Sequence, residues 1–150
     1  MNFIPVTRSK AATTRSIGIS FLAIVVYVGI STVTFLVTPN FAATVVAFIV
    51  GAIVALWIMR KTWPALFKTL LAYAFAARIP VAILMIFAIF GQWGTHYDAP
   101  APGQPEMGPF ATWVMTGLLP QTTTWIAFTV LVGSLFGGIT AALTKKTEAS

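Results

Sequence analysis

Residues 69–91 read TLLAYAFAARIPVAILMIFAIFG, an apolar run interrupted by a single charge, Arg78. A helix of about 20 apolar residues is long enough to cross the hydrocarbon core of a bilayer. Three further runs have the same character, over residues 17–37, 41–59 and 122–144. None of them alternates as a strand does, and an open sheet would leave backbone groups unpaired in lipid. The sequence therefore predicts an all-α integral membrane protein with four transmembrane helices.

The composition of the 150-residue chain supports this class, since 58% of the residues are hydrophobic and 8% are charged. Soluble domains carry about 25% charged residues, and disordered chains are poor in apolar ones. The absence of cysteine excludes disulfides, thiolate metal sites and cysteine nucleophiles. The net charge of +6 does not point to nucleic acid, because the bases flank apolar runs instead of forming a soluble patch.

Short polar segments separate the expected helices. Pro39 and Asn40 are turn formers, so the first two helices form a tight hairpin. Pro64 suits the first turn of a helix, where a missing N–H is harmless, and the third helix therefore covers residues 65–91. Residues 1–150 then form a single membrane domain.

The connection between the third and fourth helices, residues 92–121, is the one sizeable segment expected outside the membrane. It is rich in proline at first and then contains a short apolar stretch, residues 110–119. At 1.5 Å per residue this stretch reaches only about half of the bilayer core. We expect it to form either an interfacial helix or a re-entrant helix. Its mild amphipathicity favours the interfacial helix.

The basic residues predict the orientation, because eight of the nine lie on one side of a four-helix topology. These are Arg8, Lys10, Arg15, Arg60, Lys61, Lys68, Lys145 and Lys146. The positive-inside rule places that side and both termini in the cytoplasm and residues 92–121 outside. We expect a multi-pass protein of the plasma membrane, of the bacterial inner-membrane type. Tryptophans near the expected edges would lie in the interfacial belts: Trp57, Trp63, Trp93 and Trp125.

Arg78 is the most informative residue, because an arginine at the centre of a spanning helix costs about 2.5–3.5 kcal/mol on insertion scales. No expected helix contains an Asp or Glu that could pair with it. One acceptor is the carbonyl of Ala76, which Pro80 frees by lacking an N–H, and Pro80 also predicts a kink. Other acceptors at compatible depths are Tyr27, Ser31, Thr129 and Ser134. The alternatives are a structural arginine that snorkels, and a site for an anion, a lipid headgroup or an acid of another subunit.

His96, Asp98 and Glu106 are the few titratable groups of the expected outer loop, together with Tyr97. His96 and Asp98 would reach Arg78 only if this loop folded inward. Three scattered ligands make a poor metal site, and no nucleophile is arranged beside a base. We therefore expect no metal, no cofactor and no catalytic residue, and keep His96 and Asp98 with Arg78 as candidates for anion or partner binding.

Two helices carry rows of small residues, which let helix backbones approach closely in lipid. On the second helix the row is Ala43, Ala47, Gly51 and Ala55, and on the fourth it is Gly133, Gly137 and Ala141. A parallel row on the fourth helix contains Ser134, Gly138 and Ala142. We expect the first row to pack within the bundle. The double row has room for one neighbour inside the bundle and one outside.

Three functions are compatible with these features. The leading one is a non-catalytic accessory or assembly subunit that packs in the bilayer against a larger membrane complex. The alternative is a small oligomeric binder or transporter of an anion, a lipid or another solute that uses Arg78. An enzyme acting at the outer surface through His96 and Asp98 is the weakest. Lipid and other membrane subunits, in hetero- or homo-oligomers, are the expected partners.

Overall fold

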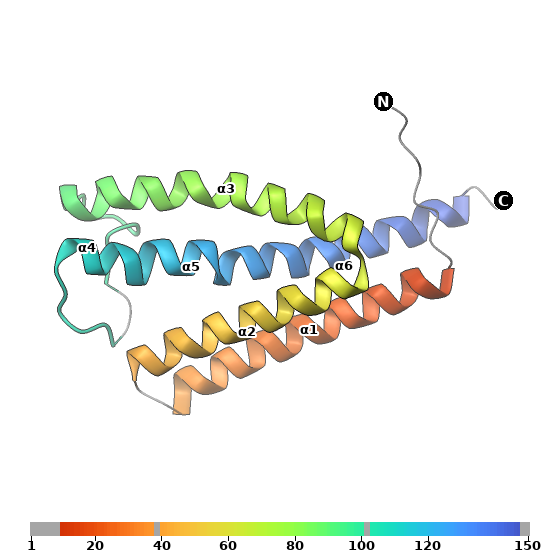
Figure 1. Ribbon diagram of the computed structural model, residues 1–150, viewed down its shortest axis with the longest axis horizontal. Helices are drawn as coiled ribbons and strands as arrows, with labels where there is room; N and C mark the ends of the chain where they lie inside the picture. The colour runs from red at the N-terminus through yellow and green to blue at the C-terminus, as the bar shows by residue number, and fades with distance from the viewer. Residues whose placement is uncertain (1–9, 38–39, 101–102, 148–150) are drawn as a thin grey trace.

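The computed structural model describes residues 10–37, 40–100 and 103–147, in which every regular element is helical. In chain order the elements are α1 (Lys10–Val37), α2 (Phe41–Thr62), α3 (Pro64–Gly91), α4 (Pro109–Thr112), the π-helical η1 (Trp113–Leu118), α5 (Leu119–Thr122) and α6 (Thr124–Thr147). Four helical segments are long and apolar enough to cross a membrane. The expected all-α fold with four such helices is confirmed, and Figure 1 shows them side by side in one elongated bundle.

The two ends of the bundle differ in chemistry. One end, which we call the loop end, carries the α1–α2 connection and the segment between α3 and α4 (Figure 1). The opposite end, which we call the basic end, carries the α2–α3 junction and the exposed side chains of Arg15, Arg60, Lys61 and Lys68. Arg8 lies outside the described residues.

The junctions follow the local chemistry of the chain. Asn40 caps α2, because its Oδ1 accepts a hydrogen bond from the backbone N–H of Ala43 at 3.1 Å. Trp63 alone separates α2 from α3, and Pro64 occupies the first turn of α3 as expected. At the loop end, α3 stops at Gln92, which adopts the left-handed conformation with φ of 48°.

The fourth segment is longer than the apolar run 122–144 alone suggests. Helical structure begins at Pro109 and is interrupted only at Thr123, so residues 109–144 form one segment with membrane-compatible hydropathy. Pro120 cannot donate to the carbonyl of Thr116, and the widened π-helical turns of η1 immediately precede it. The stretch 110–119 is therefore the first part of the fourth helical segment and packs along α3, and the irregular loop is confined to residues 92–108.

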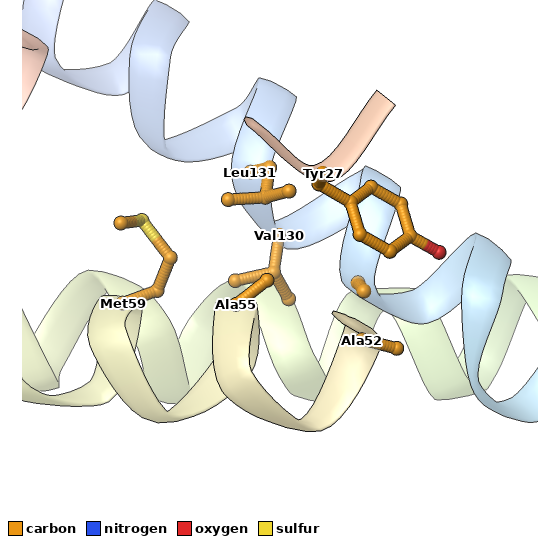
Figure 2. Packing of buried hydrophobic residues seen from close by; sticks show 7 residues of the cluster. Tyr27, Ala52, Ala55, Met59, Val130 and Leu131 are labelled. Carbon is orange, nitrogen blue, oxygen red and sulfur yellow. The ribbon is translucent and has the colours of Figure 1, made fainter. Parts of the chain in front are cut away.

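The core is built around α6, which packs against α1, α2 and α3. Figure 2 shows small alanines of α2 facing Val130 and Leu131 of α6, with Tyr27 of α1 beside them. The cluster comprises Tyr27, Ala52, Ala55, Met59, Ala127, Val130 and Leu131. Because alanine allows backbones to approach closely, the alanines of α2 let the larger side chains of α1 and α6 pack against this helix.

Large apolar side chains cover the outside of the bundle, as expected for a surface in contact with lipid. Phe21 is 60% exposed, and Leu36 and Val37 are 71% and 73% exposed. Conversely, α1 turns buried hydroxyls towards its neighbours, at Thr13, Ser16, Ser20 and Ser31. Soluble monomers rarely expose continuous apolar surface on this scale, so the distribution fits a membrane protein.

Candidate functional site

Arg78 lies midway along α3, and its side chain is half-buried. Its Nε is buried and has no hydrogen-bond partner among the described residues. The guanidinium group lies over the indole ring of Trp125, with 4.8 Å between Cζ and the ring centroid. This is the geometry of a cation–π contact, which contributes about 2 kcal/mol when desolvated.

Trp125 is itself held in place at the start of α6. Phe128 contacts its ring edge-on, with centroids 6.0 Å apart at an interplanar angle of 89°. The hydroxyl of Thr129 donates to the Trp125 carbonyl at 2.7 Å. Trp125 remains 41% exposed, so the Arg78–Trp125 pair is accessible from outside the bundle.

The position of Trp125 corrects the expectation that this residue belongs to an interfacial belt. Because residues 109–122 precede α6 as a further helical stretch, Trp125 lies level with the middle of α3 and not at the loop end. The aromatic partner of Arg78 was therefore missed. Counting the fourth segment from Pro109 instead of residue 122 would have found it.

The acceptors expected for Arg78 are used elsewhere or lie apart from it. Tyr27, Ser31 and Ser134 are buried within the bundle, and none of them bonds Arg78. Nearer the loop end, η1 is joined to α3, because Trp113 Nε1 donates to the Ala82 carbonyl at 2.8 Å. Pro80 lies within α3, which continues through it as a gently curved helix (Figure 1).

Asp98 organises the start of the loop and does not approach Arg78. Its Oδ2 accepts from the Gly94 N–H at 2.8 Å, and its Oδ1 accepts from the N–H and hydroxyl of Thr95 at 2.6 and 2.9 Å. Desolvation acts to raise the pKa of Asp98, but these hydrogen bonds stabilise the carboxylate, so the pKa is lowered overall. His96 is exposed, and its ring is tilted against that of Tyr97.

The small residues of α6 face other helices of the same bundle. A Cβ built on Gly133 would lie 2.5 Å from Leu70 Cδ2, and one on Gly137 would lie 3.0 Å from Leu66 Cδ2. The parallel row faces α1, since a Cβ on Gly138 would lie 2.8 Å from Ile17 Cγ1. The three glycines therefore have neighbours inside the bundle, whereas Ala141 is half-buried and Ala142 is exposed at the ends of the two rows.

The small residues of α2 divide between the core and a surface groove. Ala55 is buried in the core, and a Cβ on Gly51 would lie 3.1 Å from the ring of Tyr27. Ala43 and Ala47 are half-buried and line a groove of about 960 Å³ between α1 and α2. A second cavity, of about 510 Å³, lies at the loop end between α2 and residues 115–124. Arg78 lines neither of these two cavities.

In the described part of the chain, no three His, Asp or Glu side chains come together as a metal-ligand set. Comparisons with protein-family models, with curated proteins and with solved structures find no match for the chain.

Proposed function

We propose that this membrane protein is a non-catalytic accessory subunit whose α3–α6 face packs against a partner in the bilayer. One observation carries the proposal: Arg78 lies midway along α3, half-buried, and among the described residues its Nε has no partner while its charge contacts the ring of Trp125. A cation–π contact leaves the positive charge uncompensated. The helices α1 to α6 contain no Asp or Glu, which favours a compensating carboxylate from another molecule.

The chemistry of a partner follows from this geometry. Trp125 offers Arg78 an aromatic ring and no oxygen acceptor, so this contact does not satisfy the N–H donors of the guanidinium. A carboxylate on a neighbouring transmembrane helix would accept such charge-assisted bonds in a setting of low dielectric. In the membrane, a charge without a counter-charge is costly in free energy for either partner. Association would remove this cost from both molecules. The alternative is an anion held by Arg78, which lines neither of the two cavities described above.

Co-purification in mild detergent tests the proposal. Arg78→Leu should remove the partner while leaving the fold intact, because it removes the charge and also the insertion penalty. Arg78→Lys should retain part of the complex if a simple ion pair is formed, and less if both guanidinium edges are used. Lys68→Leu is the matched control, since it removes an exposed positive charge from the same helix near the basic end. Undiminished recovery of the same partner with Arg78→Leu would contradict the proposal.

We further propose that the basic end faces the cytoplasm of a bacterial cell and that the 92–108 loop faces outward. The support is the concentration of Lys and Arg at one end of the bundle. The chain has no cysteine, so single cysteines can be introduced at the exposed positions Lys61 and Glu106. An impermeant maleimide should label intact cells only through Glu106→Cys, and labelling through Lys61→Cys instead would reverse the orientation.

A further inference from the structure

The cavity at the loop end is a cleft between two diverging parts of the bundle. Figure 1 shows α1 and α2 separating from α4 and α5 towards the α1–α2 connection. The cleft between them has a volume of about 510 Å³, within the range of small-ligand sites. Its walls come mainly from the loop-end half of α2 and from residues 115–124, with Phe35 of α1 and Gly103 of the loop.

The walls of this cleft are mostly apolar, even though several threonines line it. Four threonines line the cleft, and three of them donate their hydroxyls to their own helix backbone: Thr44 to Asn40 O at 3.1 Å, Thr116 to Thr112 O at 2.8 Å, and Thr123 to Leu119 O at 2.6 Å. With their donors used in this way, they offer methyl groups to a ligand. The bulky wall residues are apolar: Phe35, Phe48, Ile49, Met115 and Leu119. A ligand that fits must therefore be hydrocarbon along most of its length.

The depth of the cleft distinguishes between possible occupants. On α2 it runs from Asn40 at the helix end to Ile49, which at 1.5 Å per residue is about 14 Å. One turn further on, Ala52 belongs to the closed core (Figure 2). The cleft thus covers about half of a bilayer core of about 30 Å. A partner helix that spans the membrane could not follow it, whereas the chain of a lipid in one leaflet has matching length.

The absence of basic side chains at the loop end restricts the headgroup that a bound lipid can carry. The only formally charged side chains of residues 79–144 are the two acids of the loop, Asp98 and Glu106, and α2 has no charged residue before Arg60. No Lys or Arg is therefore present at the loop end to hold a phosphate or carboxylate headgroup. We propose that this cleft binds one acyl chain of a lipid with a neutral or zwitterionic headgroup, taken from the leaflet at the loop end. This site is separate from Arg78 and does not depend on the proposed partner.

Native mass spectrometry of the purified protein with equimolar dioleoyl phosphatidylcholine and phosphatidylglycerol tests this proposal. We expect a one-lipid adduct with phosphatidylcholine in the wild-type protein. Ile49→Trp places an indole in the cleft and should weaken this adduct about tenfold, which corresponds to 1.4 kcal/mol. Ile53→Trp is the matched control, because Ile53 lies one turn away on α2, is 61% exposed and lines neither cavity.

Met115→Trp provides a second block from the opposite wall if Ile49→Trp does not fold. Equal adducts in the blocked and control variants would overturn the proposal, as would the absence of any adduct in the wild-type protein. A preference for phosphatidylglycerol would also overturn it, because no basic side chain lines the cleft to favour an anionic headgroup.

Discussion

Replacing Gly133 with leucine is expected to lower the free energy of unfolding by about 1–3 kcal/mol, the usual effect of overpacking. The reason is the close approach of α6 to α3, where even a Cβ on Gly133 would lie 2.5 and 3.0 Å from the two Cδ atoms of Leu70. The flexible end of Leu70 can move aside for one methyl group, but the branched side chain of leucine would force the helices apart. Equilibrium unfolding in mixed micelles measures the effect.

Gly29→Leu is the matched control for this substitution. Gly29 also lies within a helix, but a Cβ there would have no neighbour within 4 Å, so the change should not lower the free energy of unfolding, because leucine has the higher helix propensity. Adding Leu70→Ala to Gly133→Leu should recover part of the loss, because it opens space at the same contact. Equal stabilities of the Gly133→Leu and Gly29→Leu variants would show that α3 and α6 do not approach closely there.

Trp125 and Arg78 are expected to be energetically coupled by about 1–2 kcal/mol, the range of a cation–π contact with restricted hydration. Trp125→Leu should therefore destabilise the wild-type protein more than it destabilises the Arg78→Leu variant. In the first case the guanidinium loses the ring beside its charge, whereas in the second only apolar contact is lost. A double-mutant cycle in mixed micelles isolates this difference.

The control cycle combines Trp125→Leu with Phe87→Leu, an exposed position on the same helix as Arg78. Sites without a shared contact should be additive within about 0.5 kcal/mol. If the Arg78 cycle is as additive as this one, the indole does not stabilise the charge.

The helical architecture could be predicted because a membrane-spanning helix forms its backbone hydrogen bonds internally. Such a helix is recognisable in a sequence by its length and hydropathy. The same reasoning underestimated the fourth segment, because Pro109 and Pro120 are ordinarily helix breakers. Pro109 is instead accommodated in a first helical turn, and Pro120 follows the π-helical stretch that relaxes the backbone before it. Proline alone therefore did not mark where helical structure ended.

The site was predictable to a lesser degree. The unusual position of Arg78 follows from sequence, since a charge within an apolar run is conspicuous. Its contact with Trp125 depends on how α6 is placed along α3. The fourth segment begins at Pro109 and not at residue 122 as expected, so Trp125 lies near the middle of the bundle and not at its end. The neighbours of Gly133 and Gly138 likewise depend on helix rotation, which a row of small residues does not specify.

Photo-crosslinking in native membranes tests most directly whether the Arg78 face meets a partner. A benzophenone amino acid at Phe128, which adjoins Trp125 and is 37% exposed, should capture a transmembrane peptide that contains an Asp or Glu. The same group at Ile53 on α2 should not capture it, and Arg78→Leu should abolish the Phe128 product. Crosslinks from Phe128 to lipid alone, or the same proteins captured from both positions, would contradict a partner that binds through Arg78.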